Sequence, residues 1–226
     1  MQQRFRNRID AGRQLAEALR EYAGHSDVLV LALPRGGVPV AAEVAARLEV
    51  PLDVFLVRKL GVPGRPELAM GAIAAGGVRV LSEDLIRDLQ IPAALVEQIA
   101  VRERLELDRR DRLFRGDRRP PEVYGRSVIL VDDGLATGST MEAAVLALRT
   151  SAPSRIVVAV PVGAPDTCHR LARIADRVVC VETPIAFSAV GEWYDDFTQT
   201  TDDEVQSLLA GANRTTNPDR RMRASH

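Results

Sequence analysis

Two adjacent aspartates, Asp132 and Asp133, stand within the segment VILVDDGLATGST, residues 128–140, between an apolar run and a stretch of small and hydroxyl residues. The apolar run is rich in β-branched residues, which favours a strand buried on both faces of a parallel sheet. Ligands of open α/β sheets bind at the carboxyl ends of the strands, where two carboxylates can accept hydrogen bonds from a polyol. Residues 136–140 open an amphipathic stretch, and unpaired amides and hydroxyls at a helix start bind anions. This segment therefore predicts a site for a sugar phosphate.

The alternatives to a sugar-phosphate site account for less of this segment. A buried strand that ends in solvated aspartates and a Ser or Thr helix cap is an alternative for the aspartate pair alone. The chain has neither a G-x-x-x-x-G-K-[ST] loop nor a G-x-G-x-x-G after a strand, so the two common nucleotide-binding loops are excluded. A response-regulator receiver would carry its acidic pair on the first strand, whereas this pair follows residue 130.

The segment resembles the phosphoribosyl-diphosphate (PRPP) binding motif of the type I phosphoribosyltransferases. In that family the two acidic residues hold the ribose 2- and 3-hydroxyls, and the following loop wraps the 5-phosphate. The resemblance implies that PRPP contacts Asp132, Asp133, Gly134, Leu135, Ala136, Thr137, Gly138, Ser139 and Thr140. It also implies Mg2+ as a cofactor, held by Asp132 or Asp133 directly or through water, because hard oxygen ligands suit this ion.

A second junction between a strand and a loop carries glycines and a cation. The apolar run 28–33 is followed at once by Pro34, Arg35, Gly36 and Gly37, and then by an amphipathic helix. Backbone amides of a glycine-rich turn can close on an oxyanion, to which Arg35 adds positive charge. The loop resembles the pyrophosphate loop of the same family, which usually contains a cis peptide bond without proline, and we place that bond at Arg35–Gly36. An ordinary strand-turn-helix, with glycines only for geometry, is the alternative.

A basic pair marks a third junction. Residues 54–57 end another predicted strand, and Arg58 and Lys59 follow directly. Lys59 is the only lysine among 30 basic residues, and its compact, mobile charge suits a phosphate that shifts during reaction. Family members carry an Arg-Lys pair here, with the lysine reaching PRPP or pyrophosphate; a solvated pair is the alternative. Residues 61–77 hold five glycines and two prolines, which predicts a loop or a short hairpin. In the family, this region forms a flexible hood over PRPP.

The resemblance implies an enzyme that transfers the 5-phosphoribosyl group of PRPP to a nitrogen acceptor and releases pyrophosphate. The implied catalytic residues are Asp132, Asp133, Arg35 and Lys59, and Arg35, Gly36, Gly37, Arg58 and Lys59 complete the PRPP contacts. Phe187 and Trp193, in an aromatic cluster after the last predicted strand, either stack on the acceptor or belong to the core. Family members that act on 6-oxopurines carry an aspartate at the position of Ala136 and a lysine in the C-terminal hood. This chain has neither residue, so a 6-oxopurine acceptor is disfavoured.

The alternation of strand and helix patterns predicts an α/β fold with a doubly wound, mainly parallel sheet. Five strands are expected, near residues 28–33, 53–57, 127–132, 155–160 and 177–181. We also expect a first helix over 10–22, a helical insertion over 82–119 and a C-terminal hood over about 183–200. These elements form one expected domain, residues 1–210, followed by a disordered polar tail, residues 211–226.

Composition limits the partners and the compartment. The formal net charge of -1 predicts no general attraction to nucleic acid or membrane, and no apolar run approaches the ~20 residues of a membrane span. The N-terminal region lacks the apolar core of a secretory signal, and the two cysteines have no metal-binding spacing. We therefore expect a cytoplasmic protein with packed, reduced thiols.

Residues 102–119 contain eight arginines that nearby acidic residues partly balance. The pattern predicts a solvated helical face, because nucleic-acid binding needs an unopposed basic surface. The main alternative to an enzyme is a regulator that senses PRPP or nucleotides, with an RNA-binding face. Many relatives dimerise, so the resemblance also implies a homodimer.

Overall fold

The computed structural model describes residues 4–215, and its centre is a sheet of five parallel strands. The strands are β1 (Val28–Ala32), β2 (Leu52–Val54), β6 (Ser127–Val131), β7 (Arg155–Val162) and β8 (Arg177–Glu182). Their order across the sheet is β2-β1-β6-β7-β8, and every neighbouring pair is parallel. The doubly wound parallel sheet predicted from the sequence is confirmed.

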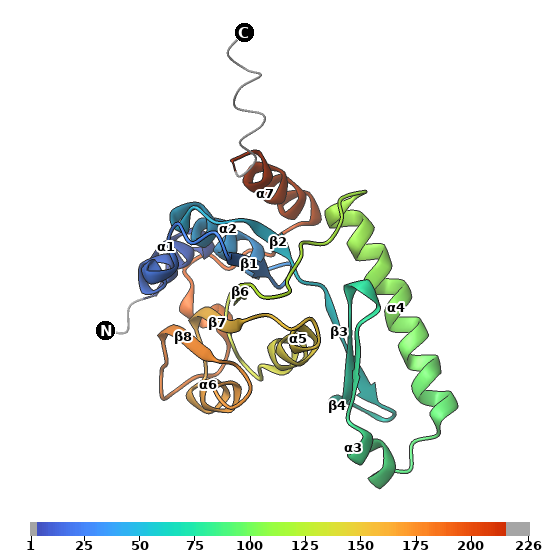
Figure 1. Ribbon diagram of the computed structural model, residues 1–226. Helices are drawn as coiled ribbons and strands as arrows, with labels where there is room; N and C mark the ends of the chain where they lie inside the picture. The colour runs from blue at the N-terminus through green and yellow to red at the C-terminus, as the bar shows by residue number, and fades with distance from the viewer. Residues whose placement is uncertain (1–3, 216–226) are drawn as a thin grey trace.

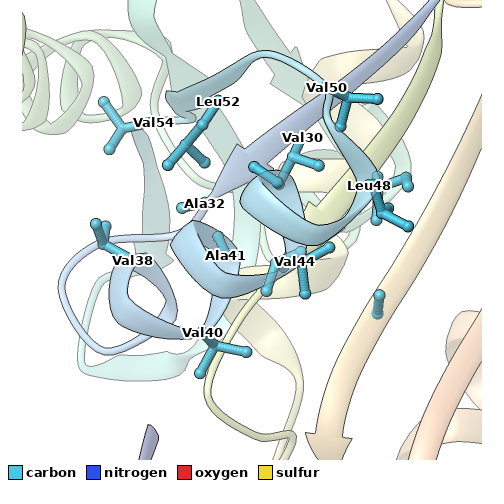
Figure 2. Packing of buried hydrophobic residues seen from close by; sticks show 14 of the residues in the cluster. Val30, Ala32, Val38, Val40, Ala41, Val44, Leu48, Val50, Leu52 and Val54 are labelled. Carbon is cyan, nitrogen blue, oxygen red and sulfur yellow. The ribbon is translucent and has the colours of Figure 1, made fainter. Parts of the chain in front are cut away.

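Helices cover both faces of this sheet, which explains why its strands are apolar throughout (Figure 1). Helices α1 (Arg8–Ala18), α2 (Gly37–Leu48) and α7 (Asp202–Thr215) pack on one face, and α5 (Ser139–Arg149) and α6 (Pro165–Leu171) pack on the other. In β1, Val28 and Val30 pack in the core under α1, α2 and α7, whereas Leu29 and Leu31 pack in the core under α5 and α6. Figure 2 shows Val44 and Leu48 of α2 beside Val30 of β1 in the first of these cores. The predicted first helix ends at Ala18, and the short helix η1 (Arg20–Tyr22) follows it.

A second, antiparallel sheet projects from the main body together with the longest helix (Figure 1). Its strands are β3 (Val57–Val62), β4 (Arg65–Ala74) and β5 (Arg79–Leu81), with the short helix η2 (Ala75–Gly77) between the last two. Pro63 and Gly64, with φ +73° at the glycine, form the turn between β3 and β4. The glycine-rich stretch, predicted as a loop or short hairpin, is part of a hairpin whose pairing shifts register on both sides of Gly61.

The position predicted for Arg58 and Lys59, directly after a main-sheet strand, is wrong. Strand β2 ends at Val54, and both residues lie inside β3. The chain changes sheets in between: Phe55 N donates to Ala32 O of β1, and Leu56 O accepts from Ala75 N next to β4. The continuous apolar run conceals this change because both sheets bury apolar residues.

The predicted helical insertion is present as α3 (Glu83–Asp88) and α4 (Ala93–Arg115). Val96 and Ala100 near the start of α4 pack on the antiparallel sheet, whereas Leu107 and Phe114 near its end belong to the core of the main sheet. The helix therefore ties the projecting sheet to the main body.

The C-terminal part differs from the expected hood and tail in one respect. After β8 the chain forms the short helix η3 (Val190–Trp193) and then α7. Residues 211–215, expected in the disordered tail, continue α7, which packs against α2 through residues such as Val205 and Leu209. The rest of the predicted tail, residues 216–226, lies outside the described residues. Within residues 4–215, no helix combines the length and the apolarity that crossing a membrane requires.

Candidate functional site

The aspartate pair and the first glycine-rich loop meet at one edge of the main sheet. Strands β1 and β6 are neighbours in register, with Ala32 opposite Val131, so the segments that leave them emerge side by side. A methyl group on Gly36 would lie 1.9 Å from Asp133 Oδ2, and one on Gly37 would lie 2.9 Å from Asp132 Cα. Glycine is therefore required at both positions for the loop to lie against the aspartates.

The glycine-rich loop contains a cis peptide bond at Pro34–Arg35, one bond before the predicted position. Neither candidate bond precedes a proline, the residue that normally marks cis bonds in a sequence. The predicted placement at Arg35–Gly36 is wrong because it depends on position within the loop alone.

Both carboxylates of the pair lie in a poorly solvated environment. Burial raises the pKa of Asp132 well above its usual value, and the negative charge of Asp133 adds to the rise. Burial also raises the pKa of Asp133, against the opposing effect of the Arg8 guanidinium. Asp132 Oδ1 accepts a hydrogen bond from Asp133 N at 2.9 Å. Two crowded, buried acids favour a cation or a set of hydroxyl donors beside them.

Arg8, at the start of α1, is a member of the site that the sequence reasoning missed. Its Nε lies 2.9 Å from Asp133 Oδ2 and its Nη2 lies 2.8 Å from the same oxygen. A third nitrogen, Nη1, donates to Thr198 O at 2.7 Å, and the guanidinium lies 4.0 Å from the centroid of the Phe197 ring. The side chain is only 11% exposed. Arg8 therefore links Asp133 to the C-terminal segment.

Tyr194 contacts Asp133 and Phe197 lies against Arg8, whereas Phe187 and Trp193 were the predicted acceptor contacts. Tyr194 Oη donates to Asp133 O at 2.6 Å, and the Tyr194 and Phe197 rings lie 5.0 Å apart. Trp193 is 6% exposed in a core cluster, against which the partly buried Phe187 also packs. Tyr194 is 4% exposed in the same core cluster, so Phe197, at 37% exposed, is the most accessible of these four rings.

The loop after the aspartates leads into the open N-terminus of α5. Gly138 precedes the helix with φ +70°, and a methyl group there would lie 2.4 Å from Thr167 Cγ2. The Thr137 and Ser139 hydroxyl oxygens lie 3.2 Å apart. The first amides of an α-helix have no partner within the helix, so this end of α5 suits an anion.

Helix α6 supports this loop from behind, through two residues that the sequence reasoning also missed. Thr167 Oγ1 donates to Ala136 O at 2.7 Å, and Arg170 donates to Thr137 O. The carbonyl and the amide of one trans peptide unit point in opposite directions. The amides of Thr137 and Gly138 therefore point away from α6.

The predicted cations Arg35, Arg58 and Lys59 have different surroundings. Arg58 lines a small cavity together with Pro34 and Thr140, so each of the three predicted motifs contributes to its wall. The Arg58 guanidinium also pairs with Glu103 of α4 at 2.6 Å. Lys59 is the next residue of β3 and faces the other side of the strand, the side on which Val57 packs against the core that includes α5. Arg35 is partly exposed and lies 3.6 Å from Asp202 at the start of α7.

The carboxylates of the site fit a magnesium ion whose remaining ligands come from water and the substrate. Within the described part of the chain, no cluster of three or more His, Cys, Asp or Glu side chains could hold a metal. Mg2+ is commonly bound by one or two carboxylates together with water and substrate phosphates. Asp132 and Asp133 supply such a pair of hard oxygen donors.

A family model and the curated relatives of the chain name the same family. A family model described as the phosphoribosyl transferase domain matches residues 3–196. The Mycobacterium tuberculosis protein named "Putative phosphoribosyl transferase Rv0571c" is 50% identical over 210 residues, which cover 93% of this chain and 47% of that protein. The chain thus spans about half the length of the curated relatives it matches. The crystal structure of TT1426 from Thermus thermophilus is 46% identical with a TM-score of 0.85, and the match covers 92% of this chain and 98% of that one.

Proposed function

Because the chain belongs to the phosphoribosyl transferase family, we propose that it transfers the 5-phosphoribosyl group of PRPP to a nitrogen acceptor and releases pyrophosphate. The observation that carries this proposal is the junction of three features at one sheet edge. A buried aspartate pair lies directly against a glycine-rich loop and immediately before the open N-terminus of α5. A diol, a diphosphate and a terminal phosphate on one molecule need these three features side by side.

In the proposed complex, each part of the site has a separate task. The carboxylates of Asp132 and Asp133 accept hydrogen bonds from the ribose hydroxyls, and the amides and hydroxyls of residues 134–140 bind the 5-phosphate. Arg35, Lys59 and the amides of Gly36 and Gly37 stabilise the negative charge that develops on the departing pyrophosphate. Arg58, on the cavity wall beside Pro34 and Thr140, contributes hydrogen-bond donors, while Glu103 balances its charge.

The bond to be broken joins the ribose C1 to the pyrophosphate oxygen. Mg2+ would supply positive charge to the departing pyrophosphate, and Asp132 or Asp133 would hold it directly or through water. The acceptor nitrogen, held on the opposite side of C1, attacks with inversion as the electron-poor sugar develops. No side chain forms a covalent bond in this scheme. The projecting hairpin β3-β4 is the proposed cover that excludes water from C1.

The acceptor is proposed to be a nucleobase other than a 6-oxopurine, because Ala136 stands at the position of the aspartate that 6-oxopurine enzymes carry. Trp193 and Tyr194 are both packed in the core, which favours the more exposed Phe197 as the ring that contacts an acceptor. Phe187, which is partly buried against the same core cluster, stays a weaker candidate.

A turnover assay tests the proposal. Purines, pyrimidines and other amines are offered one at a time with PRPP and Mg2+, and pyrophosphate release is measured. We expect release that depends on one class of acceptor and stops when EDTA removes the metal. Measurable PRPP binding with no release for any acceptor would instead support a PRPP-sensing regulator, and absence of PRPP binding would refute both.

RNA binding by such a regulator has little support from α4. Its arginines are largely paired with acids: Arg109 and Arg110 with Glu106, and Arg115 with Asp111 and Asp53. We expect no binding to single-stranded or duplex RNA at about 150 mM salt in a filter assay. Tight binding that weakens steeply with salt would contradict this expectation.

Replacement of Gly36 by alanine tests the contact between the loop and the aspartates. The backbone of Gly36 is helical, at φ -59° and ψ -32°, so alanine fits the torsion angles, but its methyl group displaces the Asp133 carboxylate. A shift of ~1 Å in a positioned group can reduce function about 100-fold, so we expect PRPP affinity to fall by about 10- to 100-fold. Isothermal titration calorimetry measures the change.

Gly24→Ala is the matched control for Gly36→Ala. Gly24 has φ +72° and open space around its side-chain position, so alanine strains the backbone without touching the site. The control should unfold at a lower temperature yet bind PRPP as the unmodified chain does. Equal loss of affinity in both variants would show that general destabilisation, and not the displaced carboxylate, is responsible.

Arg8→Gln tests the support of Asp133. Glutamine removes the charge beside Oδ2 and cannot reach both Asp133 and Thr198, so we expect PRPP affinity to fall about tenfold, in line with the ~1.5–3 kcal/mol of a hydrogen bond to a charged group. Arg8→Lys keeps the charge but not the planar fork and should recover part of the loss. Arg13→Gln, on the same helix but paired with Glu43 at the surface, is the control. Tighter binding by Arg8→Gln would identify Arg8 as a competitor for Asp133.

A further inference from the structure

The two cysteines of the chain lie in contact although they come from different elements. Cys168 belongs to α6 and Cys180 to β8, and their Sγ atoms lie 2.8 Å apart. Both residues are partly exposed and carry free thiols. A disulfide has an S–S length of about 2.05 Å, so the two sulfurs need to approach by less than about 1 Å to become bonded.

The thiol pair lies behind the loop of residues 134–140. Gly163, directly after β7, lies between the thiols and the loop: a methyl group there would lie 2.7 Å from Cys168 Sγ and 3.3 Å from Leu135 Cβ. Leu135 and Gly163 form an isolated β-bridge, in which Leu135 N donates to Val162 O and Ala164 N donates to Leu135 O. The pair therefore touches the same short segment that holds the base of the loop.

Cys168 also shares its helix with both residues that support the loop from behind. Thr167 and Arg170 of α6 bind the carbonyls of Ala136 and Thr137. Helix α6 is short, and Cys180 belongs to a strand of the main sheet. A covalent bond between the two cysteines would fix the position of α6 against that sheet.

We propose that Cys168 and Cys180 form an oxidation site that a peroxide converts into a disulfide, and that this bond immobilises α6 and the loop 134–140 that α6 supports. The hydrogen bond with Cys180 lowers the pKa of the Cys168 thiol, and the same contact, together with burial, raises the pKa of the Cys180 thiol. Cys168 is thus the sulfur that reacts first, because the thiolate is the nucleophile.

The reaction balances with one peroxide as the oxidant. The Cys168 thiolate attacks one peroxide oxygen, so that an S–O bond forms, the O–O bond breaks, and the departing oxygen takes a proton and leaves as water or an alcohol. The Cys180 sulfur then attacks the Cys168 sulfur, the S–S bond forms, and the hydroxyl of the sulfenic acid leaves as water with the Cys180 proton. Two electrons pass from the sulfur pair to the peroxide, and a dithiol reductant reverses the change.

Intact-mass spectrometry of the full chain tests the bond itself. Because the chain has two cysteines, we expect a stoichiometric dose of hydrogen peroxide to lower the mass by about 2 Da and remove both reactive thiols, with full recovery in dithiothreitol. Cys180→Ser, which keeps a hydrogen-bond donor beside Cys168, should instead accumulate a sulfenic acid at Cys168 that dimedone traps. A gain of ~16 Da per oxygen on separate thiols, or disulfide-linked dimers on a non-reducing gel, would overturn the proposal.

Hydrogen–deuterium exchange tests the link to the loop and needs no ligand, so it is independent of the proposed transferase activity. We expect amides of residues 134–140 to exchange at least about threefold more slowly in the oxidised chain than in the reduced one. Peroxide-treated Cys168→Ala, which cannot form the bond, should exchange as the reduced chain does. A disulfide that forms without any change in exchange over residues 134–140 would refute the immobilisation of the loop.

Discussion

Asp133→Asn is expected to abolish PRPP binding and turnover while the chain stays folded. Asparagine has nearly the shape of aspartate but lacks the charge that pairs with Arg8, and it presents one acceptor oxygen in place of two. Hydrogen bonds to a charged group contribute about 1.5–3 kcal/mol each, so the loss of two such bonds lowers affinity by at least about 100-fold. Calorimetric titration with PRPP and Mg2+, together with pyrophosphate release, measures both effects.

Asp176→Asn provides the matched control for this variant. Asp176 also has a structural role, since its Oδ2 accepts from Ile156 N at 2.7 Å and pairs with Arg149 at 2.8 Å. It precedes β8 at the amino-terminal edge of the sheet, opposite the candidate site. The control should lose some stability and no affinity. Asp133→Asn that retains full PRPP binding and turnover would refute the assignment of the site.

The strands and the two loops of the site were predictable because their signals are local. An apolar run of five or six residues identifies a buried strand, and glycine or paired aspartates directly after it mark the loop. The general rule that parallel strands carry their ligands at their carboxyl ends then brings the loops together. Gly36 follows β1 and Asp133 follows the neighbouring strand β6, so the same rule predicts their contact.

The remaining parts of the site depend on contacts that leave no local signal. Arg8 is one of several arginines near the N-terminus, and nothing in its spacing indicates that it pairs with a carboxylate 125 residues later. The break after Val54 is concealed because two different sheets bury the same apolar run. Whether Trp193 stacks on a ligand or packs in the core depends on which elements cover it, and its neighbours Phe5 and Ala11 come from the other end of the chain.

A buried arginine at the end of α4 contributes to the junction between the projecting sheet and the main body. The side chain of Arg115 is 2% exposed, and its Nη2 donates to Val54 O at 2.7 Å. Its Nε lies 3.3 Å from Asp53 Oδ2, and Asp53 is also buried. These contacts join α4 to β2 directly before the chain enters β3, which carries Arg58 and Lys59.

Arg115→Met is expected to lower the free energy of unfolding by about 3–5 kcal/mol, the usual cost of removing one partner from a buried ion pair. The loss arises because Asp53 and the carbonyl of Val54 remain buried without the guanidinium. Urea denaturation measures it, with Arg112→Met, an exposed arginine one turn earlier on α4, as a control that should change stability by less than about 0.5 kcal/mol. The double variant Asp53→Leu and Arg115→Met should recover much of the loss, because an apolar pair leaves no buried charge. If the double variant is no more stable than Arg115→Met, the cost lies in the carbonyl of Val54 and the packing of α4, and the ion pair is not what fixes the helix.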